Sequence, residues 1–413
     1  MHRFKYIGRS LFCEKVKVSD IAAKVGTPLY VYSRNTLLDH YAKIKEAFAS
    51  VSPLICFSVK SNSNLSVLRA LVKAGAGVDI VSGGELYRAK LAGAPPERVV
   101  YAGVGKRRDE IMDAIRYGIL FFNVESEEEL TLVNACAASL GKKVNVAVRI
   151  NPDVDVSTHD YIKTGKGQTK FGVNFDTAKR IFRSSWKYRN IAIRGVHIHI
   201  GSQILNPQPF RRAIKKVLGF LDKNSLLVEY LNIGGGMGVV YSLEKPQTAT
   251  GFAGKILPLV RKSNLKLILE PGRFIAANSG ILVTMVLFRK KNGQKRFIIV
   301  DGAMNDLIRP SLYEAYHEIL PVTKPRRRAS VARYDIVGPV CETGDFLAKN
   351  RKMTEPASGD LLAVMGSGAY GYSMSSNYNS RPRAAEVIVD GNKFFVVKKR
   401  ETYGDLVRGE TIR

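Results

Sequence analysis

The chain is poor in cysteine and lacks a long hydrophobic run. Its four cysteines, Cys13, Cys56, Cys136 and Cys341, lie far apart and form no CxxC or metal-ligand spacing. We therefore expect no disulfide framework, no metal and a reducing compartment. The N-terminal "MHRFKYIGRSLF" has no apolar signal core, and Ile281–Phe288 is too short to span a bilayer. These absences predict a cytoplasmic protein without a membrane partner.

Acidic residues are scarce relative to basic ones. The sequence has 64 Lys and Arg against 36 Asp and Glu, a formal net charge of +28. Such an excess raises the question of nucleic acid. The two densest basic runs, Lys324–Arg333 and Arg289–Arg296, have the composition of surface turns and lack the interleaved aromatic residues of a base-stacking surface. A solvated basic surface is favoured, with no nucleic-acid partner.

What the sequence does have is an alternation of apolar runs and amphipathic helical patterns. Its 413 residues, 45% hydrophobic and 24% charged, suffice for two domains or for one large barrel with an extension. Continuous apolar strands alternating with helices predict a parallel sheet covered by helices. Eight strands fit a closed (β/α)8 TIM-like barrel, with an open doubly wound sheet as the alternative. The expected strands are Leu54–Val59, Val78–Val81, Val99–Ala102, Leu120–Val124, Val144–Ile150, Ile193–Ile200, Leu231–Ile233 and Lys266–Leu269.

After about residue 280 the pattern becomes that of an all-β domain. Short β-type runs alternate with turn signals such as "KNG", "SGD" and "DGN". The N-terminal run "PLYVYS" has the same character and is expected to join them. We therefore predict an N-terminal segment, residues 1–32, packed with the β domain. The barrel is predicted at 33–280 and a C-terminal β-sandwich or barrel domain at 281–413.

Polar residues stand at the ends of strand after strand in the expected barrel. In chain order they are Lys60, Asp79–Glu85, Arg149, His197 with His199, Gly234–Gly236, and Glu270–Arg273. Taken singly, a strand-end lysine is usually surface, a glycine triplet a turn and a histidine pair structural. In a (β/α)8 barrel, however, all these ends meet at one mouth, where active sites lie.

Several motifs in this order carry a family resemblance. They are "VKSN" with "VDIVSGGEL", then "HIHIGSQ", "NIGGG", "EPGR", "GPVCETGD" and "GAYGYSMSSNYNSRPR". The chain resembles the alanine racemase-fold (fold type III) pyridoxal-phosphate decarboxylases. It is most similar to their diaminopimelate branch, which "THDYIKTGKGQTKFG" and "NDLIRPSLYEAYHEI" favour over the ornithine and arginine branches. It departs from the family in "DGAMND", with Gly and Ala reversed, and in the Ser of "SVKSN". Neither change removes a functional side chain.

The resemblance implies pyridoxal 5'-phosphate as cofactor. Lys60 would anchor its aldehyde as an aldimine, as suits an amine partly desolvated at the barrel mouth. Glu270 would keep the ring nitrogen protonated and His199 would stack on the ring, while His197 is as readily structural as functional. The resemblance also implies a polar network around Lys60 formed by Asp79, Glu85 and Arg149. The residues implied for the cofactor phosphate and its surroundings are Ser202, Gly234, Gly235, Gly236, Gly272, Arg273 and Tyr370.

The resemblance also implies the reaction, which is decarboxylation of meso-2,6-diaminopimelate to L-lysine and CO2, the last step of lysine biosynthesis. Cys341 would donate the proton that replaces CO2, although by residue type alone it would be a buried core thiol. The residues implied for the distal end of the substrate are Arg273, Arg309, Tyr313, Glu342 and Tyr370. Since the family's Cys motif reaches the neighbouring subunit's barrel, a homodimer with shared active sites is implied.

Rival readings stay open at this stage. The chain could decarboxylate ornithine, arginine or carboxynorspermidine, or it could be a racemase of the same fold. It could also be a non-catalytic paralogue, although the anchoring Lys, the ring-nitrogen Glu and the motif Cys are all present. Whether the segment 159–169 closes over substrate cannot be read from its sequence.

Overall fold

The computed structural model describes residues 2–155, 169–325 and 330–413. They divide into two compact units. The barrel unit comprises Asp39–Val239 and Lys245–Phe274, and the β-rich unit comprises Met1–Leu38, Val240–Glu244 and Ile275–Arg413. The sequence-based boundaries at 32 and 280 stay a prediction, and the units differ from them chiefly in the short Val240–Glu244 segment, which belongs to the β-rich unit. The segment 159–169, except Thr169, lies outside the described residues.

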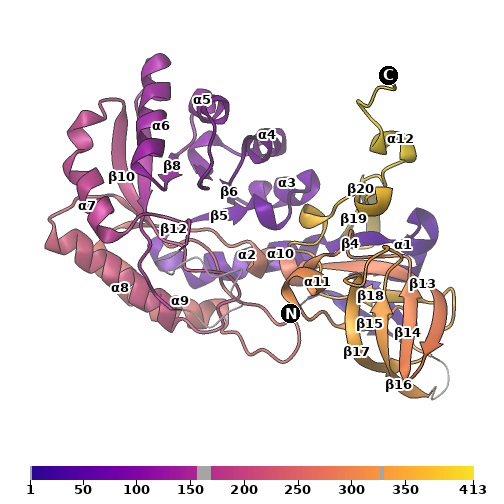
Figure 1. Cartoon of the computed structure of the whole chain (residues 1–413). Coiled ribbons are helices and arrows are strands. Elements are labelled where there is room, and N and C mark those ends of the chain that lie inside the picture. Colours follow the sequence, from indigo (N-terminus) through magenta and orange to yellow (C-terminus); the bar gives the residue numbers. More distant parts are fainter. Residues whose placement is uncertain (1, 156–168, 326–329) are drawn as a thin grey trace. The chain divides into compact units, whose positions relative to one another are not determined.

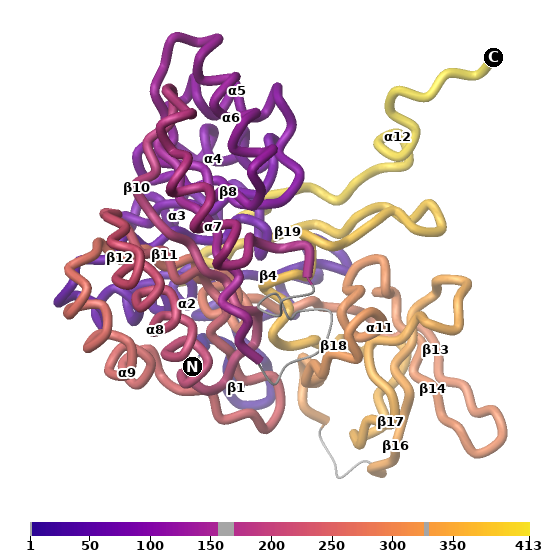
Figure 2. Tube along the Cα trace, turned by 60° about the vertical axis from the view of Figure 1, so that its left-hand side comes forward, coloured from indigo at the N-terminus to yellow at the C-terminus, as the bar shows by residue number. Residues whose placement is uncertain are grey.

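The barrel unit is a closed ring of eight parallel strands with helices outside it (Figures 1 and 2). All eight predicted strands are confirmed, within a few residues at each end. Around the ring, β9 pairs with β10, and β12 closes on β5. The strands are β5 (Leu54–Ser58), β6 (Gly77–Ile80), β7 (Val99–Tyr101), β8 (Phe121–Val124), β9 (Val144–Arg149), β10 (Ile191–His197), β11 (Tyr230–Asn232) and β12 (Lys266–Leu269).

The strands are apolar on both faces because helices cover the outside and side chains fill the inside. One buried cluster joins residues of five strands: Cys56, Val100, Phe121, Ala147 and Ile268. The barrel is therefore packed below its mouth, and polar chemistry is confined to the strand ends. The helices of this layer are α2 (Arg34–Ala47), α3 (Leu65–Lys73), α4 (Gly83–Ala92), α5 (Arg108–Tyr117), α6 (Glu127–Ser139), α7 (Phe175–Arg183), α8 (Gln208–Lys223), α9 (Ala249–Ser263) and α10 (Arg273–Ala276).

Helix starts follow the capping residues of the sequence. Asn64 accepts a hydrogen bond from the backbone N–H of Ser66 at the start of α3. Ser126 accepts one from Glu129 at the start of α6, which satisfies an otherwise orphaned donor. The Glu129 carboxylate in turn accepts from the backbone N–H of Glu125 and pairs with Lys106.

The β-rich unit is built on a mixed sheet in which the N-terminal strand β4 lies between β13 and β19. Its core joins residues from both ends of the chain, among them Leu11, Val31, Ile281 and Val387. Its elements are β1 (Phe4–Ile7), β2 (Ser10–Cys13), β3 (Val16–Lys17), α1 (Val18–Val25), β4 (Leu29–Ser33), β13 (Gly280–Asn292), β14 (Lys295–Val300), α11 (Arg309–Tyr313), β15 (Ile319–Pro321), β16 (Val331–Val337), β17 (Phe346–Thr354), β18 (Leu361–Val364), β19 (Ala385–Asp390), β20 (Lys393–Lys398) and α12 (Tyr403–Leu406).

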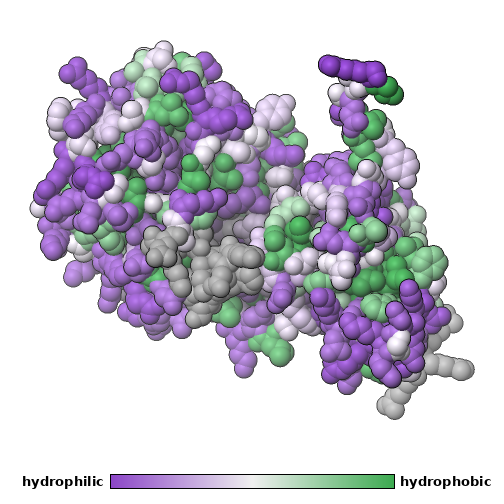
Figure 3. Space-filling model, viewed as in Figure 1, coloured by the Kyte–Doolittle hydropathy of each residue, from purple (hydrophilic) through white to green (hydrophobic). Residues whose placement is uncertain are grey.

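The net charge of the chain is +28, and hydrophilic residues cover much of the face that Figure 3 shows. The basic run Arg289–Arg296 forms the turn between β13 and β14, where Arg289 pairs with Glu355 and Lys295 with Asp335. The other run includes residues 326–329, which are outside the described part of the chain. Among the described residues, none of the helices is both long enough and apolar enough to cross a membrane.

Candidate active site

Lys60 stands just beyond the carboxyl end of β5, on the single turn Val59–Ser61. Its Nζ lies 2.5 Å from Oδ2 of Asp79. Asp79 belongs to the neighbouring strand β6 and is fully buried. Ser58 donates to the same carboxylate oxygen at 2.7 Å. About a third of the Lys60 side chain is exposed (36%). The amine is therefore reachable from the mouth, and its charge is paired rather than simply desolvated.

Asp79 carries an unusual carboxylate. Burial raises its pKa, the negative charge of Glu270 raises it further, and Lys60 opposes both. Its second oxygen, Oδ1, is buried and has no hydrogen-bond partner among the residues that the structure describes. A buried polar atom of this kind calls for a partner that the chain itself does not supply.

Glu270 follows β12 and is also buried, but its environment acts in the opposite direction. Asn232 and Asn123 donate to its Oε1 at 2.6 and 3.2 Å, and Nε2 of His197 lies 3.3 Å from its Oε2. Burial alone would raise the pKa of Glu270. The influence of His197, followed by that of Lys60 and the Asn232 hydrogen bond, instead holds it below its usual range. The mouth thus keeps this carboxylate ionised, while it disfavours ionisation of Asp79.

His199 lies two residues beyond His197 and faces the glycine loop. Its Nδ1 accepts a long hydrogen bond, 3.3 Å, from the backbone N–H of Gly235. Burial, followed by the positive charges of Arg149 and Lys60, holds the pKa of His199 well below its ordinary value. The ring is consequently neutral at physiological pH, which suits a flat, uncharged face for stacking.

The loop Gly234–Gly236 can only be glycine. An added Cβ would lie 2.7 Å from the Ile198 carbonyl oxygen at Gly234, 2.1 Å from that of Glu270 at Gly235, and 2.3 Å from that of Gly201 at Gly236. The chain's own backbone packs so closely against this loop that only glycine fits there. In the structure the N–H of Gly234 donates to Asn232 at 2.9 Å. That N–H has an internal acceptor already, so its predicted role in phosphate binding stays a prediction.

Arg273 and Ser202 are brought together. Nε of the buried Arg273 donates to the Ser202 hydroxyl at 3.0 Å. Gly272 lies against Ser58 and Ser61, whose side-chain atoms would be 3.0 Å from an added Cβ. The "EPGR" segment is thus packed directly against the turn that carries Lys60.

The predicted network of Asp79, Glu85 and Arg149 around Lys60 divides into three environments. Asp79 touches Lys60 directly. Glu85 accepts from the backbone N–H of Val81 at 2.8 Å, and burial raises its pKa to about 7 against the opposing charge of Lys60. Arg149 pairs instead with the buried Glu125 at 2.8 Å.

Four residues of the mouth were absent from the sequence-based set: Ser58, Asn123, Glu125 and Asn232. Asn123, Glu125 and Asn232 belong to the ends of β8 and β11, and Ser58 ends β5. A rule that takes every polar residue at a barrel strand end as a candidate would have found them.

The remaining candidates, Arg309, Tyr313, Cys341, Glu342 and Tyr370, all belong to the β-rich unit. Arg309 is buried, whereas Cys341 and Glu342 are exposed. The backbone N–H of Cys341 donates to the Asn379 side chain at 2.7 Å. Tyr370 adopts a left-handed backbone conformation with φ of 56°. The exposed thiol excludes the reading of Cys341 as a buried core residue within the described chain.

The "GPVCETGD" loop around Cys341 is held through its backbone. The buried Asp345 accepts from the N–H of Val340 and of Met304, each at 2.7 Å. These contacts fix the loop without using either Cys341 or Glu342. Both side chains lie at its surface, where the Glu342 carboxylate interacts with the Tyr378 hydroxyl and raises its pKa.

The barrel mouth fits pyridoxal 5'-phosphate on its own geometry. A reachable primary amine suits the aldehyde, and the buried Oδ1 of Asp79 offers an unused acceptor. The ionised Glu270 suits a protonated ring nitrogen, and the side-chain-free Gly234–Gly236 loop suits a close anionic group. Among the described residues no cluster of His, Cys, Asp and Glu suits a metal ion.

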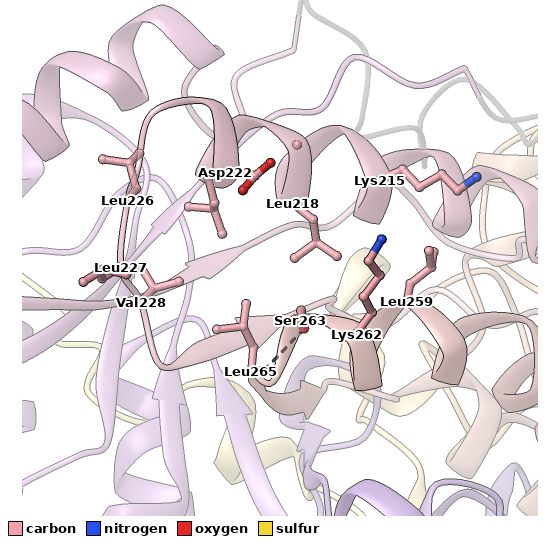
Figure 4. Close-up of a pocket in the computed structure, with 12 residues that line it drawn as sticks. Lys215, Leu218, Asp222, Leu226, Leu227, Val228, Leu259, Lys262, Ser263 and Leu265 are labelled. Carbon is pink, nitrogen blue, oxygen red and sulfur yellow. Dashed lines mark hydrogen bonds between the residues drawn. The ribbon is translucent and has the colours of Figure 1, made fainter.

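A groove of about 600 Å³ lies elsewhere in the barrel unit, between the ends of α8 and α9 (Figure 4). Leucines dominate its lining, with Lys215 and Asp222 from α8 and Lys262 from α9. Its loop residues precede β11 and β12, so it lies at the amino ends of these strands. Catalytic groups of such barrels stand at the carboxyl ends, so this groove is not the candidate active site.

Comparisons with known proteins agree with this geometry. Residues 34–277 match the family model of the pyridoxal-dependent decarboxylases, pyridoxal binding domain. A diaminopimelate decarboxylase from Aquifex aeolicus is 49% identical over 98% of this chain and 96% of its own length. The crystal structure of the Helicobacter pylori diaminopimelate decarboxylase, complexed with L-lysine, superposes with a TM-score of 0.90 at 41% identity, covering 94% and 98% of the two chains. The crystal structure of the M. jannaschii diaminopimelate decarboxylase, in co-complex with L-lysine, superposes with a TM-score of 0.94 at 35% identity, covering 99% and 98% of the two chains.

Proposed function

Because the chain belongs to the diaminopimelate decarboxylases, a family of pyridoxal-dependent decarboxylases, we propose that it converts meso-2,6-diaminopimelate to L-lysine and CO2. This is the last step of lysine biosynthesis. The observation that carries the proposal is full-length similarity at up to 49% identity, together with the Lys60, Asp79 and Glu270 arrangement at the mouth. The cytoplasmic location inferred from the scattered cysteines stays part of the proposal.

The barrel residues would hold the cofactor. When bound, pyridoxal 5'-phosphate supplies an electron sink for the electron pair left behind as CO2 departs. Lys60 presents its amine beside Asp79, which can take up or return a proton over 2.5 Å. Glu270, held ionised by its neighbours, would favour a protonated ring nitrogen in the cofactor, and the neutral His199 would offer a stacking face.

Residues of the β-rich unit would bind the far end of the substrate and complete the reaction. Arg309, with Arg273 of the barrel unit, suits a carboxylate because guanidinium binds it bidentately. Glu342 suits the distal ammonium, and Tyr313 and Tyr370 add hydroxyl donors. The Cys341 thiol delivers a proton to the carbon that lost CO2. The thiol must then regain a proton before the next turnover.

We also propose a homodimer whose two active sites each combine one protomer's Lys60 with its partner's Cys341. The support is that Cys341 and Glu342 are exposed on a loop fixed by other residues, as suits groups offered to a second subunit. A two-fold dimer would repeat this exchange at both sites.

A side-by-side product assay tests the function. Purified protein with added cofactor should release CO2 from meso-diaminopimelate and form L-lysine. Ornithine and arginine, which lack the distal carboxylate, should react at least ~100-fold less efficiently, since a buried guanidinium would be left without its anion. Comparable turnover of ornithine, or none of diaminopimelate, would refute the proposal.

A further inference from the structure

The guanidinium of Arg309 contacts an imidazole and a phenol ring. Arg309 begins α11 and is 5% exposed. Its NH1 lies 2.9 Å from Nε2 of His317, and its guanidinium carbon lies 4.6 Å from the centre of the Tyr241 ring. All three residues belong to the β-rich unit. The sequence analysis named Arg309 but neither of these two neighbours.

The hydrogen bonds of His317 determine its tautomer. The ring is fully buried, and its Nδ1 lies 2.8 Å from the backbone carbonyl oxygen of Met365. A carbonyl can only accept, so Nδ1 carries the hydrogen. A guanidinium can only donate, so Nε2 must be the acceptor. His317 is therefore a neutral imidazole that joins Arg309 to the backbone after β18.

Tyr241 holds the guanidinium from another side. Its ring meets His317 edge to face, with centroids 5.4 Å apart and an interplanar angle of 70°. Gly366 makes room for it, because an added Cβ there would lie 3.1 Å from the Tyr241 ring. Gly366 also has a φ of +67°, which favours glycine independently. Tyr241 itself lies five residues after Gly236, the last residue of the barrel unit's glycine loop.

Neither the imidazole nor the phenol ring brings a negative charge. These two contacts thus orient the guanidinium without cancelling its charge. An arginine side chain loses rotamer freedom when it is fixed, which costs free energy. His317 and Tyr241 form a cradle that fixes the Arg309 side chain beforehand, so ligand binding no longer bears that cost.

We propose that His317 and Tyr241 are positioning residues that orient Arg309 for the distal carboxylate, and that they thereby set the preference for substrates with a carboxylate at the far end. This inference rests on the proposed function. It goes further by assigning substrate selectivity to two residues that the reaction itself does not use.

Two small ligands separate this role from a structural one. L-Lysine retains the distal amino-acid group, with its carboxylate, whereas cadaverine has the same chain and two amines but no carboxylate. Both bind to the cofactor-loaded protein and are measured by calorimetry. In His317→Leu the Kd of L-lysine should rise ~10- to 100-fold, as expected for loss of a hydrogen bond to a charged group, and that of cadaverine less than ~3-fold. His317→Gln keeps an acceptor and should recover most of the loss.

Equal weakening of both ligands, or no weakening of L-lysine, would overturn the proposal. If His317→Leu fails to fold, Tyr241 provides the same test: Tyr241→Leu removes the ring, and Tyr241→Phe retains it and should weaken L-lysine binding less. Failure of the proposed function is recognised separately, because the unaltered protein would then not form L-lysine from diaminopimelate in the product assay.

Discussion

The barrel mouth and the Cys341 loop hold their functional groups in opposite ways. At the mouth, Asp79 and Glu270 are buried and contacted by other side chains, which drive their pKa values in opposite directions. On the loop, Cys341 and Glu342 are exposed, and only the backbone around them is fixed. A group whose protonation is set by neighbouring side chains is surrounded. A group that must exchange a proton with water is left open.

The largest expected effect tests the surrounded region. Lys60→Ala should abolish the visible absorbance of bound cofactor and lower turnover at least ~10⁴-fold, because the covalent anchor is lost. Absorbance spectra and a lysine assay measure both. Lys73→Ala, an exposed lysine on α3, is the matched control and should behave as the unaltered protein. Full activity in Lys60→Ala would contradict the assignment of the anchor.

The open region should respond differently. Cys341→Ala should keep the cofactor absorbance and lose ~10²- to 10⁴-fold in turnover, the range of a missing proton donor. Its neighbour Thr343, also exposed, supplies the control Thr343→Ala. A simultaneous loss of absorbance in Cys341→Ala would mean that the loop serves the cofactor rather than the proton transfer.

Mixing the two variants asks whether the two regions act across a dimer. Lys60→Ala and Cys341→Ala protomers, each inactive alone, should regain about a quarter of normal activity after unfolding and refolding together, since a random mixture leaves about that share of shared sites intact. Sites built within one protomer would regain nothing. Refolding the unaltered protein alone gives the yield against which recovery is scaled.

The smallest effect concerns Glu85. Its pKa of about 7 in the folded protein, against an ordinary 4.5, means that the folded state binds a proton more tightly than the unfolded chain. This contribution is fully present below pH 4.5 and is lost as the pH rises through 7. Urea unfolding should show the cofactor-free protein losing up to about 3 kcal/mol of this contribution by pH 8, relative to Glu85→Gln. Parallel pH profiles for the two proteins would contradict it.

Much of the fold was predictable because barrel strands are long apolar runs with clear breaks between them. Strand β17 was not predicted from the sequence, because Lys349, Arg351 and Lys352 interrupt its apolar pattern. Among the described strands it is an edge strand beside β16, where such charges are tolerated.

The candidate site was predictable for residues whose type declares their chemistry, such as Lys60 and Glu270. The positions of Asn232 and Glu125 at strand ends could have marked them as candidates. Their roles could not be predicted, because an amide or carboxylate at a strand end acquires a role only from the neighbour it reaches. Likewise, Arg149 meets Glu125 only because the consecutive strands β8 and β9 pair, which brings the two strand ends together. The cradle of Arg309 combines three separate segments, and no local pattern announces it.

Asn232 has a consequence of its own. Its oxygen receives the Gly234 N–H and its nitrogen donates to Glu270, so one amide aligns both the loop and the carboxylate. Exchange of that NH2 for an oxygen, as in Asn232→Asp, would set two anions face to face at 2.6 Å. Such repulsion would force a proton onto one of the two carboxylates. If Glu270 took it up, it could no longer favour a protonated ring nitrogen in the cofactor. A change at Asn232 would thus act on Glu270 and on the glycine loop together.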